Sequence, residues 1–276
     1  MKELGIHRRH GIGHSTNLVG RPTDWLASYA FNDDPAPLHI WGVCEMNRSL
    51  FEMLAQAHDL AEAGDAFNCY MMAMFGIDPE QRKGTGLGAG RRRYRSSFLR
   101  LIKGWGSDSN GPEGAVLKGW VESRFGICPS FHKEIIERVS SGAWATYVEE
   151  KMSSRFHNNA IYVQLDLLFE FCQWAIERFA FPGQTHLTLF RGVNEFDEHR
   201  LVEWTGKRTA MVRLNNLTSF SSDRGIASCF GDTILTARVP ASKIVFFNGL
   251  LPSHPLQGES EYLVIGGEYR VTAQYF

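Results

Sequence analysis

The chain lacks the residue patterns that mark metal-binding, disulfide-rich or membrane-spanning proteins. Its five cysteines, at positions 44, 69, 128, 172 and 229, include no CxxC pair and form an odd total. This spacing excludes a zinc ribbon and disfavours a disulfide framework. The longest apolar stretch, around residues 70–75, is too short to cross a bilayer, and the first residues lack the apolar core of a signal peptide. We therefore expect a soluble, reduced and cytoplasmic protein.

Neither sign of charge is in excess. The sequence has 29 Lys and Arg against 30 Asp and Glu, a formal net charge of −1, which disfavours a globally basic nucleic-acid binder. The HExxH and GxSxG signatures and a catalytic-cysteine signature are absent, so protease and serine-hydrolase functions have no support. His7, His10 and His14 have no neighbouring acid or cysteine, and we expect no metal site.

Positive charge is nonetheless concentrated in residues 80–103, which contain eight basic residues and one acid. Its densest run is Arg91, Arg92, Arg93 and Arg95. A segment of this kind either docks an acidic partner or nucleic acid, or forms a solvated helix face, and both interpretations stay open. The glycine run at 84–90 follows no strand and precedes no Lys-Ser/Thr pair, so we interpret it as a connector and not a phosphate loop.

The spacing of apolar residues predicts an α+β fold. Helical spacing predicts helices at about 50–61, 66–75, 91–104, 113–125, 130–150 and 158–180. After Gly183, runs rich in Val, Ile, Thr and Phe predict strands at 186–192, 209–215, 217–222, 233–239, 243–248, 261–267 and 268–276, with a short helix near 224–230. We expect a mostly helical region, 1–180, packed on a β-rich core, 181–276, in one compact unit.

Three polar features follow one another in the β-rich half. In chain order they are Arg191-Gly192, Ser219-Phe220-Ser221 and the pair Glu259 and Glu261. Residues i and i+2 of a strand point to the same side, so both carboxylates would face one cleft, about 6–7 Å apart. Two carboxylates on one face favour a cationic or polar ligand; a solvent-facing acidic edge strand is the alternative.

This ordered trio resembles the Arg-Ser-Glu signature of mono-ADP-ribosyltransferases of the cholera-toxin type. Residues 217–235 resemble the family's serine strand with the helix and strand that follow, and residues 258–271 its glutamate strand and hairpin. Residues 14–28, the helical half and the length resemble the bacterial ADP-ribosyltransferases that act on dinitrogenase reductase. By this resemblance Phe220 and Ser221 would complete the NAD-binding strand, where Phe220 departs from the family's commoner Thr.

The resemblance implies a split-sheet transferase core, NAD as co-substrate and arginine as acceptor. Arg191 would bind NAD through its planar charged fork, and Gly192 would let the backbone approach the nicotinamide. Ser219 would hydrogen-bond Glu261, the catalytic glutamate, which stabilises an oxocarbenium-like ribose. Glu259 would orient the acceptor guanidinium and take its proton.

The resemblance also implies partners. The loop at 249–258 helps such enzymes choose their protein substrate, and its candidate contacts are Leu250, Leu251, His254 and Leu256; packing of the leucines under the loop is the alternative. The implied protein substrate is dinitrogenase reductase, the iron protein of nitrogenase, and the implied regulator is a nitrogen-sensing PII-type signal protein.

Two other functions remain open. An NAD glycohydrolase, or a transferase with another protein target, would share the same trio. An inactive transferase fold could instead serve as a nucleic-acid-binding module through its basic segment, and would then show salt-sensitive binding and no NAD turnover.

Overall fold

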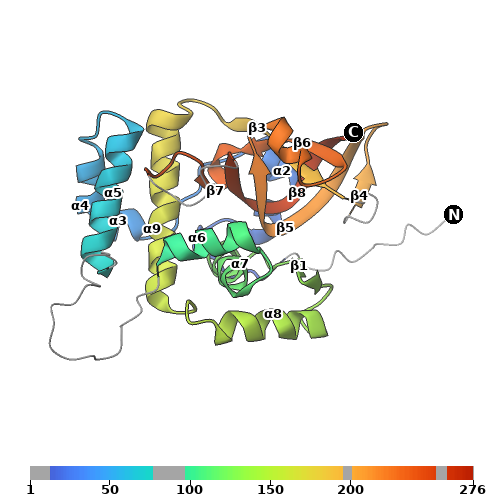
Figure 1. The fold of residues 1–276 in the computed structure, drawn as a ribbon, viewed down its shortest axis with the longest axis horizontal. Helices are drawn as coiled ribbons and strands as arrows, with labels where there is room; N and C mark the ends of the chain where they lie inside the picture. The colour runs from blue at the N-terminus through green and yellow to red at the C-terminus, as the bar shows by residue number, and fades with distance from the viewer. Residues whose placement is uncertain (1–12, 77–96, 195–200, 253–259, 276) are drawn as a thin grey trace.

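A computed structural model of the chain describes residues 13–76, 97–194, 201–252 and 260–275. Helices fill the first two thirds and an antiparallel six-stranded sheet the last third, which confirms the predicted α+β class (Figure 1). The helices are α1 (Thr23–Leu26), α2 (Tyr29–Asp33), α3 (Val43–Met46), α4 (Arg48–Leu54), α5 (Leu60–Phe75), α6 (Phe98–Ser107), α7 (Pro112–Phe125), α8 (Gly142–Ser153), α9 (Asn159–Ala175) and α10 (Arg224–Ser228). A π-helical turn, η2 (Ile176–Ala180), continues α9, and a 3-10 turn, η4 (Ala241–Lys243), follows β6. None of the helices in these ranges is long and apolar enough to cross a membrane.

Local sequence accounts for where the longer helices begin and end. The side chains of Asp59 and Asn158 accept backbone N–H bonds at the start of α5 and α9, which satisfies donors that the first helical turn leaves unpaired. Pro112 occupies the first turn of α7. Gly76 and Gly126 end α5 and α7 in the left-handed conformation, which glycine adopts without strain.

The strands are β1 (Phe131–His132), β2 (Glu134–Ile135), β3 (His186–Val193), β4 (Leu201–Trp204), β5 (Thr209–Ser221), β6 (Thr233–Pro240), β7 (Ile244–Phe247) and β8 (Glu261–Tyr275). The large sheet has the order β4-β5-β3-β6-β8-β7, and β5 also pairs with β8. That β5–β8 pairing runs from Thr209 opposite Thr272 to Ser221 opposite Glu261. Since Ser221 also pairs with Phe190 of β3, the strands β3, β5 and β8 meet at one place in the sheet.

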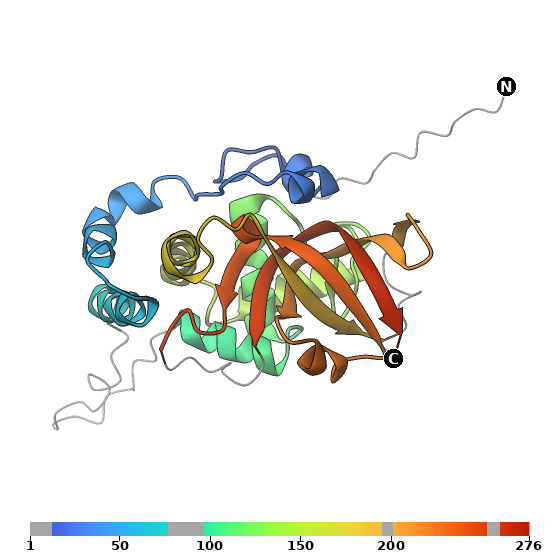
Figure 2. The same cartoon turned by 90° about the horizontal axis from the view of Figure 1, so that it is seen from above.

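Helix α9 joins the two halves of the molecule. Figures 1 and 2 show it between the α3–α5 group and the edge of the sheet formed by β7, and it contacts both. Leu165 and Leu168 of α9 belong to one hydrophobic cluster with Phe67 of α5, Phe246 of β7 and Val264 of β8, all at most 1% exposed. The helices and the sheet therefore share a core, and the domain division near residue 180 stays a prediction.

The helices at 113–125 and 158–180 are confirmed, but the helix expected at 130–150 is wrong in its first part. Residues 131–135 form the β1–β2 hairpin, and α8 begins only at Gly142. The backbone N–H of Ser130 donates to Asn215 Oδ1 (2.9 Å) and the carbonyl of Phe131 accepts from Asn215 Nδ2 (2.9 Å). These contacts across 84 and 85 residues satisfy the backbone outside a helix, which local periodicity cannot reveal.

The strands are fewer and longer than the sequence predicts. The runs at 209–215 and 217–222 form the single strand β5 with a register shift between Leu214 and Leu217, and β4 was not predicted. Residues 261–275 also form one strand, so the expected hairpin at Gly266-Gly267 is wrong. A Cβ at Gly266 would overlap the main chain of Asn215, and one at Gly267 (φ 116°) would lie 2.5 Å from the carbonyl oxygen of Ala27. The two glycines serve a close backbone approach, not a turn.

Candidate active site

The sheet register brings three predicted site residues from distant parts of the sequence together. Arg191 follows the β3 residue that pairs with Ser221, and Glu261 pairs with Ser221 from the other side. Ser219 lies two residues before Ser221, on the same face of β5. The predicted trio of Arg191, Ser219 and Glu261 is thus assembled by three neighbouring strands.

Ser219 is the centre of the hydrogen-bond network. Its Oγ donates to Glu261 Oε1 (2.5 Å), and its main-chain carbonyl accepts from an Nη1–H of Arg191 (2.7 Å). Its Oγ also accepts from the indole Nε1–H of Trp105 in α6 (2.8 Å). Glu261 is only 5% exposed, so its carboxylate is held in a largely desolvated position beside a cation.

The charges of Arg191 and Glu261 influence each other. Burial lowers the pKa of the Arg191 guanidinium from its ordinary value, and the negative charge of Glu261 acts in the opposite direction. An arginine stays protonated under such conditions because its ordinary pKa lies far above neutral pH. The site therefore presents a permanent cation next to a buried carboxylate.

A cleft of about 420 Å³ opens beside this network. Arg191 and Ser219 line it together with polar Asn110 and Thr218 and with aromatic Trp105 and Phe131. Such a mixture of apolar walls and a few converging polar groups is typical of small-molecule sites.

A buried amine lies behind the wall of this cleft. Lys118 of α7 is 1% exposed, and burial lowers its pKa to about 7. Its Nζ donates to Asn110 Oδ1 (3.0 Å) and to the carbonyl of Phe131 (3.1 Å), both residues of the cleft lining. Lys118 therefore fixes two parts of the cleft wall relative to each other.

Three of the predicted NAD-binding residues contact other parts of the protein. Phe220 is 3% exposed, and its ring packs 6.2 Å from that of Tyr269; it is absent from the cleft lining. Ser221 Oγ accepts from the backbone N–H of Asp223 at the turn into α10 (3.0 Å). At Gly192 a Cβ would overlap the carbonyl of Ala227, so this glycine lets α10 pack closely on β3.

Part of the predicted substrate-recognition loop packs against the rest of the protein. Leu250 and Leu251 are 0% and 2% exposed, so the alternative of packing holds for these two, and they offer no surface for docking. Pro252 and Leu250 lie against Gly64 of α5, where a Cβ would approach Pro252 Cδ to 2.6 Å. His254 and Leu256 lie outside the described residues.

The strand predicted to carry both acids, β8, begins only at Glu261. Ser260 has φ 45°, in the left-handed region. Strand alternation therefore does not extend from Glu261 back to Glu259, which lies outside the described residues, as do Arg91, Arg92, Arg93 and Arg95. Their predicted roles stay predictions.

Nothing in the sequence marks Trp105 as a residue of this site. Its partner Ser219 lies 114 residues away, and no spacing or motif connects the two. The residue is also 4% exposed, so it belongs to the core as well as to the hydrogen-bond network.

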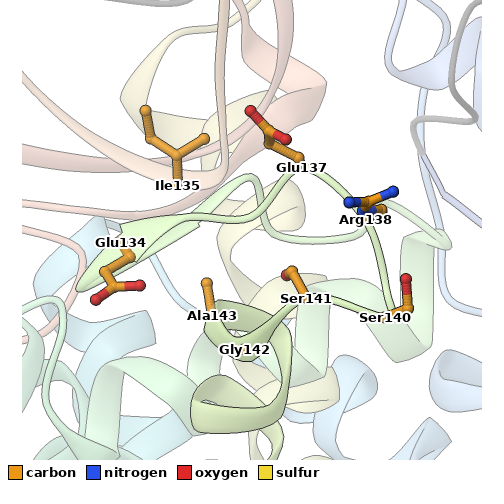
Figure 3. Close-up of a pocket in the computed structure, with 8 residues that line it drawn as sticks. All are labelled: Glu134, Ile135, Glu137, Arg138, Ser140, Ser141, Gly142 and Ala143. Carbon is orange, nitrogen blue, oxygen red and sulfur yellow. The ribbon is translucent and has the colours of Figure 1, made fainter.

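A second, larger cavity shares only Ile135 with the lining of this cleft. It measures about 630 Å³ and lies between the β1–β2 hairpin and the start of α8 (Figure 3). Its lining residues are Glu134, Ile135, Glu137, Arg138, Ser140, Ser141, Gly142 and Ala143. None of them is a predicted site residue, and in the described part of the chain no group of His, Cys, Asp or Glu could hold a metal ion. We therefore assign the candidate site to the smaller cleft.

Two comparisons with known proteins identify the same family. The family model described as dinitrogenase reductase ADP-ribosyltransferase matches residues 16–273. The chain is also 65% identical, over all 276 residues and all of the relative, to the NAD(+)–dinitrogen-reductase ADP-D-ribosyltransferase of Rhodospirillum rubrum. No solved structure shows a significant match. The match over nearly the whole length shows that this chain belongs to the dinitrogenase reductase ADP-ribosyltransferase family.

Proposed function

We propose that the protein transfers ADP-ribose from NAD to an arginine of dinitrogenase reductase, releases nicotinamide and thereby switches nitrogen fixation off. The observation that carries this proposal is the network in which Ser219 bonds both Glu261 and Arg191 at the edge of the cleft. The name of the R. rubrum relative supports the same reaction and the same protein substrate. That the acceptor is an arginine rests on the resemblance.

The cleft residues fit NAD. A dinucleotide carries a diphosphate, a nicotinamide and an adenine, and needs a cation, hydrogen-bonding groups and flat apolar surface. Arg191 supplies the cation, Asn110 and Thr218 supply polar groups, and Phe131 supplies an aromatic face, all in the lining of one cleft. NAD when bound supplies the ADP-ribosyl group and its leaving nicotinamide.

In this proposal each side chain has one task. Arg191 binds phosphate or ribose oxygens through donors other than the one it gives to Ser219. Ser219 holds the carboxylate of Glu261 by donating to Oε1. Glu261 stabilises the positive charge that develops on the ribose as the bond to nicotinamide breaks. Glu259 accepts a proton from the incoming guanidinium, which is a poor nucleophile while protonated.

The deciding experiment incubates purified dinitrogenase reductase with the protein and NAD, followed by peptide mass spectrometry. We expect one arginine to gain ADP-ribose in step with release of nicotinamide. The Glu261→Gln protein, checked for unchanged melting temperature, is the control and should leave the target unmodified. Nicotinamide release without modification would favour the NAD glycohydrolase or another protein target.

The nucleic-acid alternative is tested separately by salt-dependent binding of DNA and RNA with no NAD turnover. A PII-type signal protein as regulator and a reduced, cytoplasmic location also belong to this proposal. The regulator rests on the resemblance alone, and the location on the cysteine pattern.

A further inference from the structure

The proposed mechanism leaves one direct contact to the catalytic pair unused. Trp105, in the last turn of α6, donates its indole Nε1–H to Ser219 Oγ over 2.8 Å. The same oxygen donates onward to Glu261 Oε1 over 2.5 Å. Trp105 is 4% exposed, so its N–H is shielded from competing water.

The chemistry of the three groups sets the direction of this chain. An indole N–H only donates, an ionised carboxylate only accepts, and a serine hydroxyl has one hydrogen and two lone pairs. When Trp105 donates to Ser219, it occupies an acceptor position and leaves the hydroxyl hydrogen to point at Glu261. Without this donor the hydroxyl could rotate and accept elsewhere, and the carboxylate would lose a fixed hydrogen bond.

The surroundings of Trp105 hold it in place. Lys118 Nζ lies 5.9 Å from the centroid of its ring and is itself held by Asn110 Oδ1 (3.0 Å). One residue earlier in α6, a Cβ at Gly104 would come within 2.6 Å of Glu113 Cβ in α7. The close contact between α6 and α7 leaves little room for the indole to shift.

We propose that Trp105 is a positioning residue of the transferase reaction: it orients the Ser219 hydroxyl so that Glu261 is held for catalysis. The inference rests on the proposed function of the trio. It adds a residue from the helical half to a site otherwise built by strands.

The test is Trp105→Phe, which keeps an aromatic ring and removes the N–H. We expect kcat for nicotinamide release to fall about tenfold, as for loss of one hydrogen bond, with KM for NAD within about twofold. Isotope-labelled NAD keeps slow turnover measurable, with and without dinitrogenase reductase. If this variant does not fold, benzothienylalanine at position 105 replaces the N–H by sulfur and keeps the fused rings.

Trp120→Phe is the matched control. Trp120 is fully buried in α7, and its Nε1–H donates to Asp166 Oδ1 over 2.7 Å, away from the cleft lining. Its replacement removes the same kind of bond and should lower the melting temperature while kcat stays at the wild-type value. A general loss of packing would instead lower kcat in both variants.

A double-mutant cycle with Ser219→Ala separates positioning from other effects. Once the hydroxyl is gone, Trp105→Phe should lower kcat no further. An unchanged kcat in Trp105→Phe, or the same fall with and without Ser219, would overturn the inference. A wild-type protein that fails to cleave NAD would overturn the proposed function instead.

Discussion

Replacing Arg191 by Lys tests how the site binds NAD. In the structure an Nη1–H of Arg191 donates to the carbonyl of Ser219 (2.7 Å), and Arg191 is also one of the residues that line the cleft. A guanidinium has five N–H donors in a plane and can serve both partners. A lysine ammonium is a single compact charge, so Arg191→Lys keeps the charge but cannot hold β5 and a ligand oxygen in the same geometry.

The expected loss follows from the contacts. One charge-assisted hydrogen bond to the ligand is removed or weakened, worth about 1–3 kcal/mol. This corresponds to a Kd for NAD raised about 5- to 150-fold. The register of β3 is also set by eight residue pairs with β6, so we expect the fold to persist.

The assay is calorimetric titration with NAD, with the melting temperature measured in parallel. Arg124→Lys is the control, because Arg124 makes a two-pronged pair with Asp166 (2.7 and 2.8 Å) away from the cleft. It should lower the melting temperature and leave NAD affinity unchanged. A folded Arg191→Lys protein with wild-type affinity would refute the role of Arg191 in binding.

Three further predictions address other parts of the chain. Glu261→Gln should lower both transfer and NAD hydrolysis by about 10²–10³ or more, whereas Glu259→Gln should abolish arginine transfer and spare slow hydrolysis. The release of free nicotinamide is measured for both variants. Normal arginine modification by Glu259→Gln would contradict the role of Glu259. Alanine at Arg91–Arg93 should slow target modification at low salt, with an effect that shrinks as salt rises; an unchanged rate at low salt would mean a merely solvated face. The pKa of His39 is raised above 6.5, chiefly by its hydrogen bond to Glu170 (2.9 Å), so its protonated form stabilises the fold below about pH 6.5, and that contribution is lost as pH rises through the raised value. Urea unfolding of His39→Gln and wild type across pH should therefore show the largest difference in acid, and a difference independent of pH would argue against the pair.

The limits of sequence reasoning are clearest at the glycines and the loop. Gly266-Gly267 has the composition of a turn, yet it lies within one strand and allows the close approach of Asn215 and Ala27 from other parts of the chain. Leu250 and Leu251 are apolar in a loop that precedes the acids, a pattern that fits docking as well as burial. Their burial against the rest of the fold decided the question.

What the sequence determined by itself is local and periodic. Spacing that repeats within one element predicts α7, α9 and the β-rich character after residue 183. The order of Arg191, Ser219 and Glu261 along the chain, with the family resemblance, predicts the site residues. Tertiary structure decided which of those residues touch. The pairing of β5 with β3 and β8 joined the trio, and the packing of α6 brought Trp105 to Ser219. Contacts between distant segments depend on how whole elements pack. They therefore leave no trace in the local sequence pattern of either segment.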